Sequence, residues 1–223
     1  RIEHFHTSFN KPHEVDFLSD EYAPLGMCIS PGRQKGRWDR ELDEDVDRIR
    51  NHFQTDVMIT LLQNRDMVDI HAEDLLEVTK NAGIESIHFP IRDKFVPRSF
   101  TQFVHLVVRI ATYALENRVV VIHCNGGKGR TGLVVACTML VLYQDLSIPQ
   151  VIEIIRAARA GTLYNPLQIC YTYRFQERWR TKLPTSITPQ QLRVDPSQYH
   201  PRQRVRYSPS SSSSSSSNIA SSS

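Results

Sequence analysis

The sequence predicts an α/β domain with a mainly parallel central sheet and helices on both of its faces. Short apolar runs suited to buried strands alternate along the chain with longer segments suited to helices. Such alternation is typical of parallel sheets, because each crossover helix returns the chain to the same end of the sheet. The composition changes after Leu183, so we expect this domain to cover residues 1–183.

Four segments are predicted to form the strands. Each is short, mostly apolar, and bounded by turn formers or polar residues, which favours a buried strand. The predicted strands are residues 25–30, 56–62, 84–90 and 119–124.

The first helix is predicted from spacing alone. Residues 39–53 place Leu42, Val46, Ile49 and Phe53 on one helical face. This is the period of an amphipathic helix that packs on a sheet.

The later helices carry start and stop signals. Ser99 can cap a helix start, Pro149 suits the first turn, and Gly83 and Gly161 suit the ends. A mostly apolar segment follows the glycine-rich loop and suits a buried helix. The predicted helices are residues 71–83, 99–117, 130–144, 149–161 and 165–183.

Composition and charge argue against several classes of protein. The formal net charge is +3, and the segment from Pro184 onward carries four arginines against one aspartate, so residues 1–183 are neutral overall. This balance does not favour a nucleic-acid-binding body. The longest apolar stretch, residues 133–143, is too short to cross a bilayer, and the N-terminal residues do not resemble a signal peptide. We expect a soluble protein of the cytoplasm or the nucleus.

Residues 184–223 are predicted to form a disordered tail. They are rich in Pro, Gln and Arg and end in a serine run, so they bury too little apolar surface to fold. Their arginines suit a solvated tail, and the alternative is a docking or phosphorylated segment around Ser208.

The four cysteines, at positions 28, 124, 137 and 170, give no metal signal. They form no C-x-x-C pair and no Cys/His cluster with zinc spacing, so we expect no metal site. Cys137 and Cys170 lie in predicted helices and are expected to be core thiols.

The loop HCNGGKGRTG, residues 123–132, first suggests a nucleotide site. Gly127, Gly129 and Gly132 spell G-x-G-x-x-G between a strand and a helix. A dinucleotide site needs a second strand after that helix, ending in an acidic residue. A turn containing Asp145 leads instead into another helix, and no Gly-Lys-Ser/Thr of a P-loop occurs. Nucleotide binding is therefore disfavoured.

The same loop suits a cysteine nucleophile better. Cys124 and Arg130 are separated by five residues. Converging backbone N–H groups, the following helix N-terminus and the charges of Arg130 and Lys128 favour the thiolate form of Cys124. The same donors suit a dianionic phosphate, which an arginine can hold with two hydrogen bonds. The predicted phosphate-binding residues are Asn125, Gly126, Gly127, Lys128, Gly129 and Arg130.

This loop resembles the H-C-x5-R-S/T signature of the protein-tyrosine phosphatase superfamily, and the short domain is similar to its dual-specificity group. The likeness runs from about Leu25 to Leu183, through LGMCISPG, PIRDKFVP and the loop. It implies the phosphatase fold and hydrolysis of phosphomonoesters without a metal or organic cofactor.

The resemblance also implies individual roles around the loop. Cys124 would form a cysteinyl-phosphate, and Arg130 would bind the phosphoryl oxygens. Thr131 would donate its hydroxyl to the thiolate, and His123 would order the loop. Gln168, in TLYNPLQ, matches a glutamine that positions water in relatives.

The leaving oxygen needs a proton, which a carboxylic acid on a nearby loop can supply. Asp93 follows the strand 84–90, whose end lies at the same edge of a parallel sheet as Cys124. The resemblance also places the general acid at Asp93, and its structural alternative is a turn residue. Asp66 and Asp69 are the fallback candidates.

Cys28 is predicted as a partner for a protective disulfide with Cys124 on oxidation, because reactive thiols invite this chemistry.

The predicted function is hydrolysis of phosphotyrosine and phosphoserine/threonine in proteins. An inositol phosphate or phosphoinositide phosphatase is the alternative, which Lys128 favours and Asn125 weakens, since the resembling lipid enzymes carry a lysine at that place. A pseudophosphatase that only binds phosphoproteins is disfavoured by the joint presence of Cys124, Arg130 and Asp93. The oligomeric state is open.

Overall fold

A computed structural model describes residues 5–181 of the chain. The predicted tail, residues 184–223, lies outside the described residues. Within them, no helix is both long enough and apolar enough to cross a membrane.

The central sheet has five strands, of which four run parallel, as predicted. Its order is β2-β3-β8-β6-β7, and only the edge strand β2 is antiparallel to its neighbour. The bounds are β2 (Asp16–Phe17), β3 (Leu25–Cys28), β6 (Val57–Thr60), β7 (Glu85–His88) and β8 (Val120–His123).

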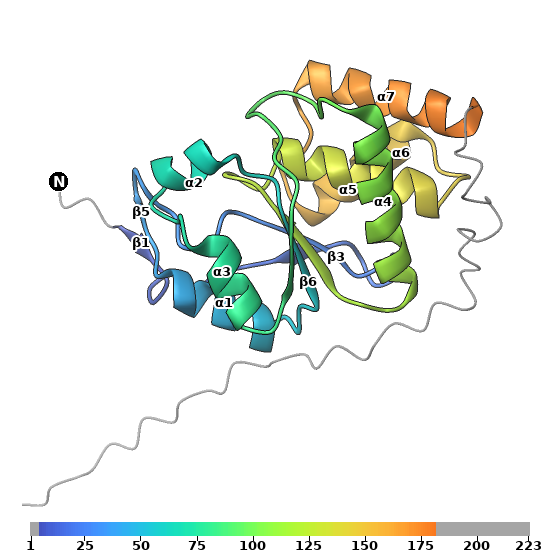
Figure 1. Cartoon of the computed structure of the whole chain (residues 1–223). Coiled ribbons are helices and arrows are strands. Elements are labelled where there is room, and N and C mark those ends of the chain that lie inside the picture. The colour runs from blue at the N-terminus through green and yellow to red at the C-terminus, as the bar shows by residue number, and fades with distance from the viewer. Residues whose placement is uncertain (1–4, 182–223) are drawn as a thin grey trace, which may run out of the picture.

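Helices cover both faces of this sheet, with α1 to α3 on one side and α4 to α7 on the other (Figure 1). Their bounds are α1 (Leu42–Asn51), α2 (Asn64–Asp69), α3 (Leu75–Asn81), α4 (Phe100–Leu115), α5 (Gly129–Leu142), α6 (Ile148–Ala158) and α7 (Pro166–Thr181).

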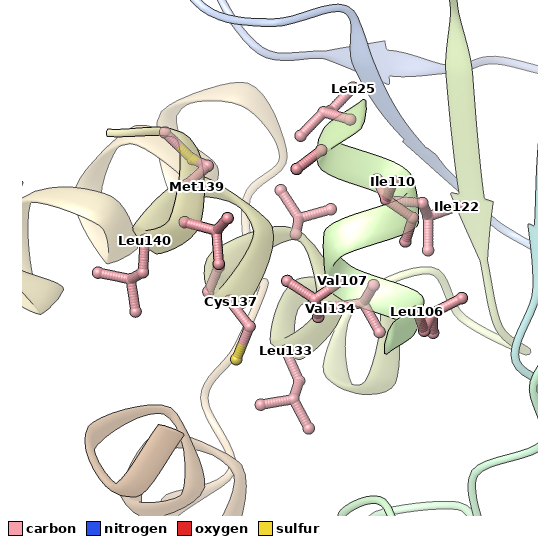
Figure 2. Packing of buried hydrophobic residues seen from close by; sticks show 14 of the residues in the cluster. Leu25, Leu106, Val107, Ile110, Ile122, Leu133, Val134, Cys137, Met139 and Leu140 are labelled. Atoms are coloured by element: carbon pink, nitrogen blue, oxygen red, sulfur yellow. The ribbon is translucent and has the colours of Figure 1, made fainter. Parts of the chain in front are cut away.

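The pleat of the strands divides the core into two layers. Because successive side chains on a strand point to opposite faces, Val120 and Ile122 pack toward α4 to α7, whereas Val121 packs toward α1 and α3. The larger layer joins the strands to α4 and α5, as Figure 2 shows for Ile122, Ile110 and Leu133. Helix α5 is buried almost along its whole length, so the loop before it is fixed between strand and core.

The N-terminal region holds structure that the sequence did not predict. Strands β1 (His6–Thr7), β4 (Gln34–Lys35) and β5 (Trp38–Asp39) form a small three-stranded sheet in the order β1-β5-β4. Two-residue strands are too short to show an apolar period, so their pairing depends on tertiary contacts.

Two helix expectations need correction. The segment 71–83 is helical only at Leu75–Asn81, and a short helix, α2, precedes it in a stretch expected to be loop. Gln63 is the N-cap residue of α2, and its backbone N–H donates to the carboxylate of Asp66 at 3.1 Å. This start signal has Gln in place of the usual Ser or Thr.

The predicted capping of α4 by Ser99 is confirmed, since its side chain accepts a hydrogen bond from the N–H of Gln102. Helix α6 begins one residue before Pro149 and is capped by Ser147.

The expectation of a core thiol at Cys170 was wrong, whereas Cys137 is buried as expected. The buried stripe of α7 consists of Gln168, Thr172, Phe175 and Trp179. Cys170 lies off this stripe and faces outward.

The last residues of four strands form one row across the sheet. Cys28 pairs in register with His123, His123 with Thr60, and Thr60 with His88. The strands are parallel, so the loops that follow them meet at one edge of the sheet. In open α/β sheets this carboxyl edge is where ligands bind.

Candidate active site

Cys124 directly follows β8 and opens the glycine-rich loop. Its side chain is only 4% exposed and belongs to the α4-to-α7 layer of the core. Helix α5 starts five residues later, at Gly129, so its N-terminal end lies beside the cysteine. A helix N-terminus favours anions, both a thiolate and a phosphate.

In the backbone of the loop, carbonyl groups are hydrogen-bonded to neighbouring segments, whereas N–H groups are free within residues 5–181. The carbonyl of Asn125 accepts from the N–H of Ser30, and that of Lys128 accepts from Gly132 and Leu163. In contrast, none of the N–H groups of residues 125–130 donates to an acceptor among the described residues. A row of free, similarly placed N–H groups forms an anion-binding nest.

Arg159, the C-cap residue of α6, holds two further carbonyls of this loop. Its Nε donates to the carbonyl of Gly127 at 2.9 Å and its Nη2 to that of Gly126 at 3.1 Å. Its Nη1 pairs with Asp16 of β2. The guanidinium therefore pulls both carbonyls away from the anion site and anchors the loop to the sheet edge.

Arg130 is fully buried and is held by one side of its guanidinium. Its Nη1 donates to the carboxylate of Asp66 at 2.6 Å and to the carbonyl of Ile91 at 2.9 Å. Its Nε is buried without a partner among the described residues. Nε is therefore available, and Nη2 becomes available when a phosphate replaces Asp93 there. The two groups can then bind two oxygens of a phosphate, the bidentate geometry that arginine favours.

Asp93 lies on the loop between β7 and α4, within reach of Arg130. Its Oδ1 is 3.1 Å from Nη2 of Arg130, and its side chain is 56% exposed. The structure therefore brings Asp93 to the anion site on a solvent-facing loop. Of the fallback acids, Asp66 also contacts Arg130 but is largely buried, and Asp69 instead pairs with Lys35.

His123 is completely buried beneath the loop, and its Nε2 hydrogen-bonds with the hydroxyl of Thr60 at 2.8 Å. Burial lowers the pKa of His123 to about 3, so the ring is neutral at physiological pH. The hydroxyl of Thr131 is buried and has no partner among the described residues, so it is free to bond to a group in the site.

Gln168 is buried although it lies near the start of α7, and it connects the two loops. Its Nε2 donates to the carbonyl of Phe95, two residues beyond Asp93, at 3.0 Å. Its Oε1 is unpaired and lies 3.0 Å from the place that a Cβ on Gly129 would take. The amide is therefore directed at the glycine-rich loop.

Two further cations, Lys128 in the loop and Arg33 beside it, lie near the anion site. Lys128 is exposed, and its Nζ lies over Gly161. Arg33, half-buried after β3, places Nη1 3.5 Å from the carbonyl of Asn125, and burial lowers the pKa of its guanidinium. The sequence reasoning missed Arg33, although its position just after a strand end was a usable signal.

Cys28 sits under the same loop. A Cβ on Gly127 would fall 1.9 Å from the carbonyl oxygen of Cys28, so strand end and loop are in close contact. Burial raises the pKa of the Cys28 thiol, so it is protonated in this state. The disulfide between Cys28 and Cys124 stays a prediction.

No group of three or more His, Cys, Asp or Glu side chains within residues 5–181 is arranged to hold a metal ion.

Comparison with known proteins agrees with this fold and site. A family model described as cyclin-dependent kinase inhibitor 3 (CDKN3) matches residues 17–152. Cyclin-dependent kinase inhibitor 3 of Rattus norvegicus is 28% identical over 155 residues, which cover 69% of this chain and 72% of the relative.

Solved structures share the fold. A kinase associated phosphatase, solved with its catalytic-site cysteine changed to serine, superposes with a TM-score of 0.72 and 24% identity, over 78% of this chain and 99% of its own. PTPMT1 in complex with PI(5)P gives a TM-score of 0.61 and 16% identity, over 76% of this chain and 100% of its own.

The fold and these relatives define an enzyme of the protein-tyrosine and dual-specificity phosphatase class, a phosphoric monoester hydrolase. Within that class, the chain belongs to the cyclin-dependent kinase inhibitor 3 family, because the family model covers more than half of it. The sequence resemblance to the dual-specificity group is thereby confirmed.

Proposed function

We propose that this protein hydrolyses phosphotyrosine and phosphoserine/threonine in proteins through a cysteinyl-phosphate. The observation that carries the proposal is the loop after β8, in which Cys124 and Arg130, with its unpaired Nε, border a row of unpaired backbone N–H groups. One cradle can then stabilise both the thiolate and the phosphoryl group that it attacks.

In the first step, Sγ of Cys124 attacks phosphorus and the bond to the leaving oxygen breaks. Asp93 gives its proton to that oxygen, and a cysteinyl-phosphate forms. Arg130 and the loop N–H groups hold the phosphoryl oxygens throughout. In the free enzyme Nη2 of Arg130 pairs with Asp93, and a bound phosphate replaces Asp93 there, which frees its carboxyl group to reach the leaving oxygen.

In the second step, water attacks phosphorus and the P–S bond breaks. The carboxylate of Asp93 accepts a proton from the water, and the hydroxyl of Thr131 stabilises the departing thiolate. Gln168, held by the carbonyl of Phe95 and directed at Gly129, positions the water. Inorganic phosphate and the free thiolate are the products.

The names of the relatives support a protein substrate. They describe a cyclin-dependent kinase inhibitor and a kinase associated phosphatase. We propose that a phosphorylated protein, with a kinase as the first candidate, is the substrate, in the cytoplasm or the nucleus, where a reactive thiol stays reduced.

The proposal predicts the effects of two substitutions on turnover of p-nitrophenyl phosphate and of phosphopeptides. Cys124→Ser should abolish turnover, and Asp93→Ala should lower kcat by about 10²- to 10⁴-fold, the usual contribution of a general acid. Binding of inorganic phosphate to Asp93→Ala should stay near that of the wild type.

Asp69→Ala serves as the matched control, because Asp69 is an exposed carboxylate that pairs with Lys35 away from Arg130. Activity retained by Cys124→Ser would contradict the mechanism. Loss of both turnover and phosphate binding in Asp93→Ala would give Asp93 a structural role.

An inositol phosphate or phosphoinositide phosphatase is the second candidate. Lys128 is exposed and has no carboxylate partner among the described residues, so with Arg33 it could bind additional phosphates. A structural neighbour, PTPMT1, was solved with PI(5)P. A parallel panel of phosphopeptides and soluble inositol phosphates decides between the two, and higher kcat/KM for the inositol phosphates would favour this candidate.

A further inference from the structure

A cavity lies beside the loop that carries Asp93. Its volume is about 540 Å³. It is bounded by the end of β7, by the loop itself and by the first turns of α4. The lining residues that matter for its chemistry are His88, Arg92, Arg98, Ser99, Gln102 and His105.

The lining is positive, and it contains no Asp or Glu. The guanidinium of Arg92 lies over the ring of Phe95 at 4.3 Å, and Arg98 has no carboxylate partner among the described residues. Three acids lie close in sequence to lining residues, and all of them have other partners. Asp66 and Asp93 pair with Arg130, and Glu85 pairs with Arg109 and Arg118. Two arginine charges therefore face this cavity without a counter-charge from its walls.

Helix α4 adds to the positive potential of this cavity. Its first turn begins at the cap residue Ser99 and contributes Gln102 to the lining. A helix N-terminus carries partial positive charge. The cavity thus combines side-chain cations with a helix dipole of the same sign.

The row of strand ends places this cavity relative to Cys124. His88 of β7 pairs with Thr60 of β6, which pairs with His123 of β8. Neighbouring strands are about 4.8 Å apart, so His88, which lines the cavity, lies roughly 10 Å from His123, the residue before Cys124. An extended peptide rises about 3.4 Å per residue and covers this separation in about three residues.

We propose that this cavity binds an acidic side chain of the phosphoprotein substrate, two to four residues from the phosphorylated residue. The inference rests on the proposed function and adds a sequence preference to it. Arg98 is the main contact, since Arg92 neighbours Asp93 and packs on Phe95. The walls include Phe89, Pro90 and Val96, which suit the aliphatic part of a Glu or Asp side chain.

The test uses nine-residue phosphotyrosine peptides on the full chain. One reference peptide has neutral flanks, and each of the others carries a single Asp two, three or four residues before or after the phosphotyrosine. We expect at least one of these positions to raise kcat/KM about 5- to 10-fold, mainly through KM, as a single added charge contact does at a partly exposed site.

Arg98→Glu should remove that preference or reverse it, measured as the ratio of kcat/KM for the acidic and the neutral peptide. Lys80→Glu is the matched control, because it makes the same charge change on α3. Lys80 lies near the start of β7, whereas the cavity lies at the end of that strand. The control should keep the ratio of the wild type.

A ratio near one at every position in the wild type, or an acidic preference that Arg98→Glu retains, would overturn the inference. The same holds if Lys80→Glu lowers the ratio as much as Arg98→Glu. Turnover of p-nitrophenyl phosphate by the wild type distinguishes failure of the proposed function from failure of the acidic subsite alone. If it is absent, the proposed function fails as well, and if it is present, a negative peptide result removes only the acidic subsite.

Discussion

At residue 127 the loop around the phosphate site requires glycine for two reasons. Its φ is +64°, and a Cβ there would meet the carbonyl oxygen of Cys28 at 1.9 Å. The carbonyl oxygen of Cys28 belongs to the backbone, so it cannot move aside as the end of a flexible side chain can. At Gly126, one residue earlier, an added Cβ meets nothing within 4 Å.

Gly127→Ala should therefore displace the loop, and Gly126→Ala should not. We expect Gly127→Ala to lower kcat/KM by about 100-fold or more, because a displacement of about 1 Å at an active site costs that much. Gly126→Ala should stay within about threefold of the wild type, as the free space there gives no reason for movement. Steady-state kinetics of both variants on one phosphopeptide make the comparison, and equal effects would contradict the geometry.

Single residues also show how far the sequence could be read. Cys124, Arg130 and Asp93 stood out because one loop pattern and one strand end placed them, and the structure pairs Asp93 with Arg130. The contacts of Arg33 and Arg159 could not be found in the same way, although Arg33 does follow a strand end. Their roles depend on contacts with Asn125, Gly126 and Gly127 across the fold, which no local spacing records.

At the scale of elements, the end of α6 holds the loop before α5. Arg159 bonds two loop carbonyls and pairs with Asp16 of the edge strand. A lysine has a single ammonium without the planar fork, so it cannot make all three contacts. We propose that Arg159, at the end of α6, orients the N–H groups of the loop for catalysis.

Arg159→Lys should lower kcat by about 10-fold or more, because loss of one or two charge-assisted hydrogen bonds corresponds to roughly 1.5–3 kcal/mol. The urea midpoint should change much less, since the core layers do not include this residue. Kinetics and urea unfolding on the same preparation test this. An unchanged kcat would mean that the loop keeps its conformation without the hydrogen bonds of Arg159.

The long elements were predictable and the short ones were not. Helices α4 to α7 and strands β3, β6, β7 and β8 follow apolar patterns of sufficient length, and their parallel order follows from the alternation. The pairing of β1, β4 and β5 does not, because each strand has only two residues. Helix α2 was missed because its cap is a Gln, and its presence places Asp66 on Arg130.

For the molecule as a whole, a buried neutral histidine at the centre of the sheet makes stability depend on pH. The pKa of His123 is lowered from 6.5 to about 3 by burial. The unfolded chain therefore binds this proton more readily than the folded one. The contribution of His123 to stability is complete above about pH 6.5 and is lost as pH falls toward 3.

The free energy of unfolding should drop by about 2 kcal/mol between pH 7.5 and pH 5 from this residue, at 1.36 kcal/mol per pH unit. His123→Gln keeps a neutral hydrogen-bonding group near Thr60 and removes the titration, so it should lose correspondingly less over the same range. Urea unfolding at both pH values measures the difference, and buried His13, whose pKa is also lowered, cancels because both proteins contain it. An equal loss in both would contradict the assignment.

The central claim is that phosphate is transferred to Cys124. The direct measurement is to mix the wild-type protein with a phosphotyrosine peptide, quench within milliseconds, and locate any phosphate on the chain by mass spectrometry. We predict a phosphate on Sγ of Cys124 that appears before inorganic phosphate is released and is absent from Cys124→Ser. Phosphate release without any phosphorylated Cys124, or with the phosphate on another residue, would contradict the mechanism.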